Sequence, residues 1–498
     1  MIGLVLLIAL FAFIFYEMYW KRRDLPPGPM PLPLIGNMIG LLKEPPGYIA
    51  YERWRKQYGP VYTYWMGSMG IVTCNDYETC KEAFVKEGDA FVDRPPPIWF
   101  RRTLGDGIMG IVETSGNEWR EQRRFALYTL REFGLGKAEM AKRVLDEAAD
   151  LLSLLENEAA AGPVAIFPHI DRTVASVINL IIFGHRFETS SPDYQHLRDL
   201  FNKMMIELRS SLIVLLVLFP PIRFLPYFST KYALLKDIRD ATMAYTRKYI
   251  TEHESDVDYS SEVSKDFCEA YLKEMKKREG DVDTSFTKEM FEYVCMDLWS
   301  AGLETTNSTL EWTLVYLINH PEVQLRAHEE LDRIIGSSEK LVEFEDRTRL
   351  PYIQAIVNET QRVANILAQN LFRQASRDVI VGGQVIPKGA TCSPQISMLL
   401  YDPEVFPDPM RFDPSRFLDD SGVLKRLDEF LPFSIGKRAC IGESLARMEL
   451  FLFTANLLNR FKISAEDPSN PPTMKRSHEN SFKPTAFNVV LHSRRLVA

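Results

Sequence analysis

The sequence is short of several features that mark common protein classes. Its 498 residues include six cysteines and no C-x-x-C pair, which argues against a disulfide scaffold and against a structural zinc site. Basic residues number 59 and acidic residues 67, and this net charge of −8 argues against bulk nucleic-acid binding. We find no internal repeat, low-complexity tract or G-x-G-x-x-G fingerprint of a dinucleotide-binding fold. The remaining composition, 46% apolar and 25% charged, is that of a globular protein, and the few cysteines favour a reducing compartment.

The first sixteen residues contain no charged side chain. They are MIGLVLLIALFAFIFY, and Glu17, Met18-Tyr19-Trp20 and the basic cluster Lys21-Arg22-Arg23 follow. Such a run is just long enough to cross a bilayer as a helix, with aromatic residues where the interface would lie. A cleaved signal peptide is the alternative, but the basic cluster follows the apolar run and no small-x-small site comes after it. We predict a transmembrane signal anchor over residues 1–20, with the rest of the chain in the cytosol by the positive-inside rule.

A basic and proline-rich hinge is predicted over residues 21–33. Its prolines cannot continue a helix, so we expect a stiff, extended connector that sets the distance between membrane and body. Residues 34–498 contain no linker long enough to divide them, and we interpret them as one large domain.

Helical periodicity dominates this body, so the predicted fold class is mainly α with small accessory sheets. The longest predicted helix runs from about residue 287 to 319, and Pro321 starts the next one. Two hairpins are predicted, one over residues 61–74 and one over 378–387, the latter turning at Gly382-Gly383. The apolar run 212–219 is too short to span a membrane, and a buried helix end and a surface patch that dips into the bilayer remain equally good interpretations.

Residues 430–442, FLPFSIGKRACIG, interrupt the helical pattern just before a strong helix that starts near Glu443. Cys440 therefore lies on a glycine-flanked loop before a helix N-terminus, where backbone N–H groups and the helix dipole favour a thiolate, the form that binds metal. A free cysteine is more often a small buried apolar residue. The complete pattern F-x-x-G-x-R-x-C-x-G, however, resembles the haem-thiolate signature of the cytochrome P450 family, and more closely that of its microsomal, family-2-like members.

This resemblance covers nearly the whole chain, because further motifs occur in the expected order. It implies a single cytochrome P450 fold over residues 34–498, with haem b bound through Cys440 as the axial thiolate ligand. Glu359 and Arg362, three apart on a helix, together with Arg416 in Phe412-Asp413-Pro414-Ser415-Arg416-Phe417, resemble the structural Glu–Arg–Arg triad of the family.

The segment Ala301-Gly302-Leu303-Glu304-Thr305-Thr306 lies in the middle of the longest helix, where glycine and threonine are poor helix formers. On its own it would be a tolerated polar patch. It resembles the oxygen-binding groove of the family, which implies that Glu304 and Thr305 deliver protons to O₂, with Thr306 the less suitable threonine.

Further residues match positions that hold the haem propionates in the family. Trp119 and Arg123 match a W-x-x-x-R element, Arg438 precedes the cysteine by two residues, and Arg373 falls where the family often has His or Arg. No proline occurs between Arg362 and Arg373, where many microsomal members have one. Because that region usually contacts substrate, specificity should not be transferred from a relative.

The resemblance implies a monooxygenase that inserts one atom of O₂ into a lipophilic substrate such as a fatty acid, a steroid or a xenobiotic. The expected electron donor is a membrane-bound NADPH-dependent flavoprotein reductase, with cytochrome b5 as a second possible donor, and the expected location is the endoplasmic reticulum membrane. Arg120, Arg124 and Lys437 are candidates for a basic docking face. Substrate contacts are expected from residues 95–100, 212–228, 371–372 and 483–485.

Two alternatives stay open at this point. One is a haem-thiolate isomerase or dehydratase that rearranges peroxides without a reductase, and the other is a membrane-anchored haem-binding protein that is not an enzyme. The Glu304-Thr305 pair favours the monooxygenase, because a peroxide rearrangement needs no proton relay.

Overall fold

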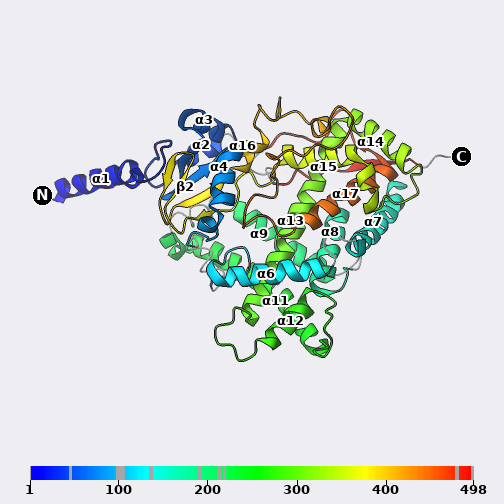
Figure 1. Ribbon diagram of the computed structural model, residues 1–498, viewed down its shortest axis with the longest axis horizontal. Coiled ribbons are helices and arrows are strands. Elements are labelled where there is room, and N and C mark those ends of the chain that lie inside the picture. The colour runs from blue at the N-terminus through cyan, green and yellow to red at the C-terminus, as the bar shows by residue number, and fades with distance from the viewer. Residues whose placement is uncertain are drawn as a thin grey trace.

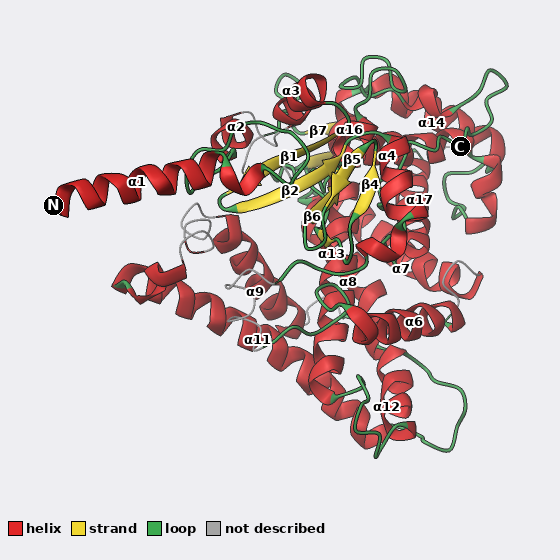
Figure 2. Ribbon diagram, turned by 60° about the vertical axis from the view of Figure 1, so that its left-hand side comes forward, coloured by secondary structure: helices red, strands yellow, loops and turns green. Residues whose placement is uncertain are grey.

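The computed structural model describes residues 2–43, 48–96, 107–133, 138–187, 192–209, 216, 220–476 and 482–494. Helices dominate these residues (Figure 1, Figure 2). The helices are α1 Ile2–Met18, α2 Met38–Lys43, α3 Tyr48–Tyr58, α4 Tyr77–Lys81, α6 Gly116–Glu132, α7 Ala138–Ala159, α8 Ile166–Phe183, α9 Pro192–Arg209, α11 Pro226–Asp256, α12 Phe267–Lys277, α13 Lys288–Asn319, α14 Pro321–Ile334, α15 Pro351–Ala364, α16 Ile396–Leu400 and α17 Glu443–Arg460. The mainly helical fold class is thereby confirmed.

The longest helix of the described residues is α13, which crosses the middle of the body (Figure 1). Its N-cap is Thr287, whose side chain accepts a hydrogen bond from the Met290 amide, and Pro321 opens α14 immediately after it. Both boundaries agree with the sequence, because a capping hydroxyl and a proline at the first helical position are local signals. Helices α8, α15 and α17 pack around α13 and form most of the buried core with it.

The described strands form three small sheets. They are β1 Val61–Met66, β2 Met69–Cys74, β3 Arg373–Gln374, β4 Val379–Val381, β5 Gln384–Ile386, β6 Thr391–Pro394, β7 Phe461–Ala465 and β8 Val489–Ser493. The largest sheet has the order β1-β2-β6-β3, and β4-β5 and β7-β8 are separate antiparallel pairs. Strands β1 and β2 lie near the end of the molecule from which the N-terminal helix projects, whereas β7 and β8 contact α17 and α7 (Figure 1, Figure 2). Both predicted hairpins are confirmed. Gly382 and Gly383 have φ of 55° and 75°, the left-handed conformations that a two-residue turn of this kind requires.

Helix α1 projects away from the body, and only 6% of its apolar window is buried (Figure 1). It is long and apolar enough to span a membrane, as the sequence predicts. Helix α8 meets the same criteria of length and composition, but 72% of it is buried among other helices. We therefore regard α1 as the candidate membrane span and α8 as a core helix.

The proline-rich segment after α1 contains no α-helix, and it lies against strand β1. The Pro27 carbonyl accepts a hydrogen bond from the Thr63 amide at 3.0 Å. A Cβ on Gly28 would lie 1.8 Å from the Thr63 carbonyl oxygen, so glycine is required for this contact. The segment thus attaches the anchor helix directly to the sheet.

Candidate active site

Cys440 lies on the loop that leads into α17, whose N-cap is Gly442. Two backbone features hold this loop. Gly436 has φ of 78°, and a Cβ there would lie 1.9 Å from the Phe84 carbonyl oxygen, so another residue would clash with the backbone. The Cys440 amide donates to the Phe433 carbonyl at 3.0 Å. The loop therefore presents the sulfur at the start of the helix, as the sequence predicts.

The Cys440 side chain is accessible, whereas Cys74, Cys80, Cys268, Cys295 and Cys392 are buried. The five buried cysteines are therefore packing residues, and Cys440 differs from them. Protein atoms still surround the Cys440 sulfur on its other sides. This burial raises the pKa of the thiol, although the Gly442 amide, the Arg123 guanidinium and the Glu443 amide act to lower it. The expected net lowering of the thiol pKa is thus wrong for the protein alone, because desolvation outweighs the helix N-terminus.

Arg123, Arg373 and Arg438 meet beside this loop. Arg438 donates to the carbonyls of Val92 and Ile111 and lies 4.0 Å above the Trp119 ring. Arg123 donates to the Ala439 carbonyl at 2.6 Å, and Arg373 donates to the Ile435 carbonyl at 2.8 Å. The structure therefore brings together the four residues Trp119, Arg123, Arg373 and Arg438 that the sequence assigned to propionate binding.

This arginine cluster has the properties of an anion site. Burial and the neighbouring guanidinium groups lower the pKa of Arg438 to about 8 and that of Arg373 to about 9. No ion pair with a carboxylate is found for Arg123, Arg373 or Arg438 in the described part of the chain. The Trp119 Nε1 and Arg373 Nε donors are buried and have no hydrogen-bond partner within the part of the chain that the structure describes. A flat ligand with two carboxylates, such as haem b, would satisfy these donors and relieve the repulsion.

Sequence reasoning missed Arg94, which belongs to the same cluster. Its guanidinium acts on the pKa of both Arg373 and Arg438, and it donates to the Val112 carbonyl at 2.7 Å and to the Phe372 carbonyl. Arg94 thereby links the segment before α6 to the start of β3. The only signal in the sequence is an arginine before a run of prolines, which does not reveal a partner 278 residues away.

Helix α13 has an accessible strip in its otherwise buried middle. Ala301 is exposed, and Gly302 and Thr305 are half-buried, whereas Leu303 and Thr306 are buried. Thr305 Oγ1 donates to the Ala301 carbonyl at 2.7 Å, the bond to the preceding turn that the sequence predicts for a threonine here. Gly302 permits close packing of α8, because a Cβ there would lie 2.7 Å from Ile178 Cδ1.

This strip and Cys440 lie beside the same helix. Thr306 Oγ1 is 3.4 Å from the Glu449 carboxylate on α17. Glu449 is six residues, or roughly 9 Å, along α17 from its first residue. The packing of α13 on α17 therefore brings the Thr305 region close to the Cys440 loop.

Glu304 and Thr305 point in different directions, although they are neighbours in sequence. Glu304 is buried and pairs with Arg198 of α9 and with Lys483, whose Nζ is 3.0 Å from Glu304 Oε2. Burial raises the pKa of Glu304, but Lys483 and Arg198 outweigh it and the net shift is downward. Thr305 Oγ1 is bonded to the helix backbone and not to Glu304.

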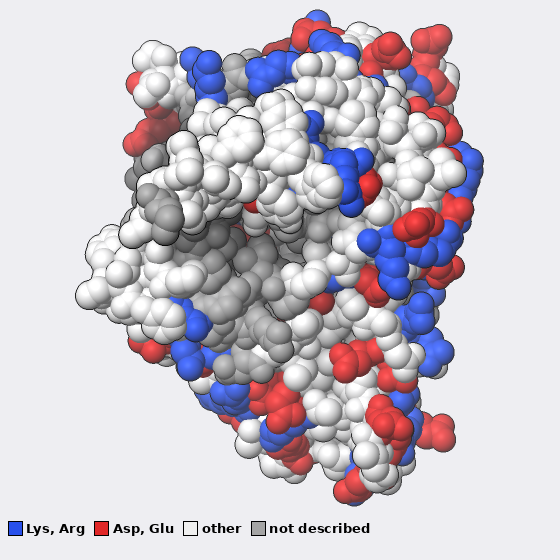
Figure 3. All heavy atoms as spheres, turned by 90° about the vertical axis from the view of Figure 1, so that its left-hand side faces the viewer, with Lys and Arg blue, Asp and Glu red and all other residues white. Residues whose placement is uncertain are grey.

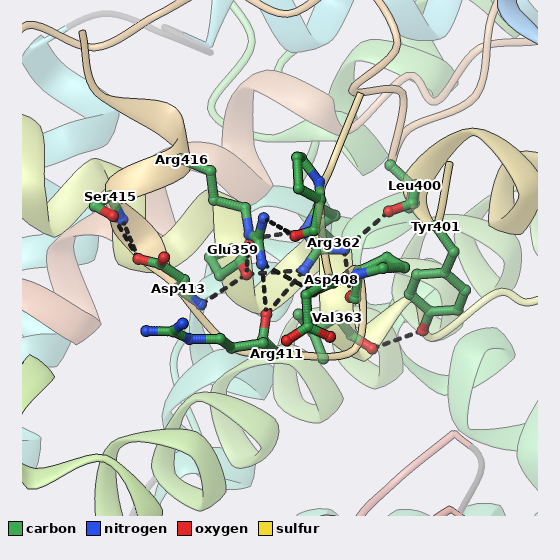
Figure 4. Close-up of polar contacts among 12 residues, drawn as sticks. Glu359, Arg362, Val363, Leu400, Tyr401, Asp408, Arg411, Asp413, Ser415 and Arg416 are labelled. Carbon is green, nitrogen blue, oxygen red and sulfur yellow. Dashed lines mark hydrogen bonds and ion pairs between the residues drawn. The ribbon is translucent and has the colours of Figure 1, made fainter. Parts of the chain in front are cut away.

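The predicted triad residues form one buried network at the C-terminal end of α15 (Figure 4). Glu359 and Arg362 are fully buried and share two hydrogen bonds of 2.7 and 2.8 Å. Arg416 Nε donates to Glu359 Oε1 at 3.0 Å, and the Asp413 amide donates to the same oxygen at 2.8 Å. Arg362 also donates to the Leu400 carbonyl at 2.9 Å. The network thus joins α15 to α16 and to the segment 407–417.

The segments predicted to contact substrate are described only in part. Residues 97–100 and most of 210–219 lie outside the described residues, so the two interpretations of the run 212–219 remain open. Leu216 alone is described there, and it is buried against Leu235. Leu371 is exposed, and Lys483 belongs to the ion pairs around Glu304.

Two surfaces complete the site. On the end of the molecule that bears α1, white atoms of uncharged residues cover much of the surface above a central hollow, and most of the coloured charged side chains lie nearer the edge (Figure 3). Exposed apolar residues of this end include Leu32, Leu34 and Ile39. Beside the Cys440 loop, α6 forms a basic depression lined by Arg120, Arg124, Arg131 and Lys437.

Comparisons with known proteins agree with this geometry. The family model of cytochrome P450 matches residues 26–490. The chain is 36% identical to "Cytochrome P450 2C44" of Mus musculus over 467 residues, which is 93% of this chain and 92% of that protein. It is 37% identical to "Cytochrome P450 2C23" of Rattus norvegicus over 89% of this chain and 88% of the relative. It is 35% identical to "Cytochrome P450 2D6" of Homo sapiens over 97% of this chain and 96% of that protein.

Proposed function

The chain belongs to the cytochrome P450 family of haem-thiolate monooxygenases, and from that premise we propose that it inserts one atom of O₂ into a lipophilic substrate, with electrons from an NADPH-dependent flavoprotein reductase. The proposed substrate classes are fatty acids, steroids and xenobiotics. The observation that carries the proposal is the accessible Cys440 at the start of α17, next to Arg123, Arg373 and Arg438, which form no ion pair with a carboxylate among the described residues.

Haem bound through a thiolate supplies the chemistry of O₂ activation, because the thiolate favours cleavage of the O–O bond. In this proposal the protein residues hold and surround it. Cys440 would supply the thiolate ligand, and Trp119, Arg123, Arg373 and Arg438 would hold the propionates. Arg94 extends the cationic side of the cradle.

We assign the proton supply to Thr305 and Glu304. Thr305 Oγ1 lies on the accessible strip of α13, and its hydroxyl delivers a proton there when it rotates away from the Ala301 carbonyl. Glu304 pairs with Arg198 and Lys483 and resupplies the threonine with a proton from the Lys483 ammonium, because an arginine keeps its proton. Transfer between the two requires Glu304 to leave one of these partners, because its carboxylate is bonded to them and not to Thr305.

We also propose a function for each of the three segments of the chain. Residues 1–20 act as the membrane anchor, 21–33 as the hinge and 34–498 as the catalytic domain on the cytosolic face of the endoplasmic reticulum. The projecting helix α1 and the basic cluster after it support this arrangement.

The decisive experiment is a reduced carbon-monoxide difference spectrum of the purified protein and of Cys440→Ala. We expect a thiolate-type Soret band in the wild type and its loss in the variant, with Cys392→Ala as a control that removes a buried cysteine. Absence of the band from the wild type would overturn the proposal. NADPH consumption and product formation with a reconstituted reductase then separate a monooxygenase from a reductase-independent isomerase or dehydratase.

We further propose that the basic depression on α6 docks the reductase, and cytochrome b5 where it takes part. Among the described residues, Arg120 and Arg124 form no ion pair, whereas Lys437 pairs with Asp89, so the two arginines supply most of the free charge.

The double variant Arg120→Glu/Arg124→Glu should slow reduction by the reductase at low salt, because charge steers association, and the difference should shrink as salt screens it. Stopped-flow reduction rates at two ionic strengths measure this. Lys276→Glu on α12 is the matched control of a surface cation elsewhere. Equal rates for the double variant and the control, with haem content intact, would exclude this docking face.

A further inference from the structure

A cluster of buried charges surrounds Glu304 and includes an acid that the proton supply described above does not use. Asp171 of α8 and Glu304 of α13 both pair with Arg198 of α9. Lys483 contacts Glu304 Oε2 at 3.0 Å and Glu311 Oε1 at 3.9 Å. Glu311 thus joins the cluster through a lysine that it shares with Glu304.

The cluster contains more acid than base. Among the described residues, three buried carboxylates, on Asp171, Glu304 and Glu311, face the two cations Arg198 and Lys483. Buried charges are costly without partners, so one carboxylate is better protonated than ionised.

Among these three carboxyl groups, protonation is most favourable at Glu311. Its side chain is 3% exposed, its nearest cation is 3.9 Å away, and its Oε2 has no hydrogen-bond partner among the described residues. Glu304, in contrast, has a cation on each carboxylate oxygen. Burial raises the pKa of Glu311 to about 7, with Asp171 and Glu304 raising it and Lys483 and Arg198 lowering it.

The placement of these residues also defines a route for protons between Glu311 and Glu304. Glu304 and Glu311 are seven residues apart on α13 and therefore share a face of the helix. Lys483 lies between their carboxylates and is 19% exposed, so it connects the buried pair to solvent. Trp312 Nε1 donates to the Phe482 carbonyl at 3.1 Å, which fixes the segment that carries this lysine.

We propose that Glu311 is a proton-holding residue that resupplies Glu304 through Lys483. This inference rests on the proposed role of Glu304 and Thr305. When Glu304 has taken a proton from the Lys483 ammonium, the lysine takes one from the Glu311 carboxyl and is an ammonium again. Glu311 is then a carboxylate and regains its proton from solvent. Each transferred proton therefore has a donor and an acceptor, and no other reactant is needed.

A purely structural Glu311 would give a different result. The variant Glu311→Gln keeps the size of the side chain and removes the proton that can be transferred, and Glu311→Asp keeps a titratable acid. Glu330→Gln is the matched control, because Glu330 is also buried and its pKa is also raised, but it accepts hydrogen bonds from the Tyr352 and Ile353 amides away from the cluster.

The first measurement is infrared absorption of the haem-loaded protein between about pH 5 and about pH 9, which span the pKa of the acid. The difference spectrum of wild type minus Glu311→Gln should contain a protonated-carboxyl band that disappears as the pH rises through neutrality. The difference spectrum of wild type minus Glu330→Gln should lack that component. No such band in the Glu311 difference spectrum would overturn the inference.

The second measurement is product formed per NADPH with the reconstituted reductase. We expect Glu311→Gln to lower this ratio a few-fold, well below the roughly 10²-fold effect of an acid that touches the reacting atoms. The rate of reduction should not change, and Glu311→Asp should restore part of the ratio. An unchanged ratio would also overturn the inference. A wild type without the thiolate-type carbon-monoxide band would instead refute the proposed function, and the infrared titration would still decide whether Glu311 holds a proton.

Discussion

Glu449 is a buried acid next to the candidate oxygen groove. Its carboxylate is 3.4 Å from Thr306 Oγ1, and its Oε1 has no hydrogen-bond partner among the described residues. Burial raises its pKa to about 8, although the hydrogen bond from Thr306 acts to lower it. The carboxyl is therefore protonated at neutral pH, and the sequence alone shows only an acid within a helix.

Glu449 should make the stability of the protein decrease with pH. Between its unfolded pKa of 4.5 and its folded pKa of about 8, the folded state holds a proton that the unfolded state has lost. The free energy of unfolding therefore falls as the pH rises through this window, by at most about 5 kcal/mol. Glu449→Gln should remove the contribution of Glu449 to this decrease in the free energy of unfolding. Urea unfolding midpoints at about pH 5 and about pH 9 measure the effect.

The control for this variant is Glu329→Gln, on the exposed face of α14, which should leave the pH dependence unchanged. If wild type and Glu449→Gln lose stability equally between the two pH values, then Glu449 is ionised in the folded protein.

At the scale of elements, the Glu359–Arg362–Arg416 network joins α15 to the segment 407–417 (Figure 4). A single sequence shows the spacing of Glu359 and Arg362 but not their burial. Surface pairs at this spacing contribute little, whereas a fully buried pair leaves an uncompensated charge when one partner is removed. Burial therefore decides the energetic importance of this pair.

Glu359→Gln should destabilise the catalytic domain by about 3–5 kcal/mol, because both arginines lose the charge they share. Arg349→Ala is the matched control, since Asp346 and Arg349 have the same three-residue spacing but Arg349 is 56% exposed. That variant should cost no more than about 1 kcal/mol. Urea unfolding followed by tryptophan fluorescence compares them, and equal losses would show that burial of the pair adds nothing.

At the scale of the whole molecule, the anchor helix and the body meet at a defined joint. Glu17 is buried and pairs with Lys21 at 2.8 Å, and the Lys21 ammonium lies 4.1 Å from the centre of the Trp65 ring on β1. The acid that interrupts the apolar run in the sequence thus belongs to this contact. The joint fixes the direction in which α1 leaves the body (Figure 1).

Lys21→Ala should loosen this joint, because it removes both the ion pair and a cation–π contact that contributes about 0.5–2 kcal/mol. Polarised absorption of the haem in oriented bilayers should then show a broader range of tilt than in the wild type. Arg23→Ala removes a cation from the same cluster, but its pair with Asp24 is exposed, so the tilt should stay narrow. If the range of haem tilt is as narrow in Lys21→Ala as in Arg23→Ala, then Lys21 does not make the joint rigid.

The sequence by itself determined the features that depend on neighbouring residues. The apolar helix α1, the boundaries of α13 and the hairpin at Gly382-Gly383 follow from apolar length, capping and turn chemistry, which act within a few residues. The position of Cys440 before α17 is local in the same way. The residue pattern around Cys440 resembles the signature of the family, and it therefore indicated a haem-thiolate protein.

Only the tertiary structure decided the features that depend on distant segments. Arg94 reaches the cluster of Arg373 and Arg438, and Lys483 reaches Glu304 and Glu311, because the fold places segments that are far apart in sequence side by side. It also decided the direction of pKa shifts, as at Cys440, where burial outweighs the local helix terminus. The physical reason is that desolvation and charge pairing depend on every group nearby in space, which a linear pattern does not contain.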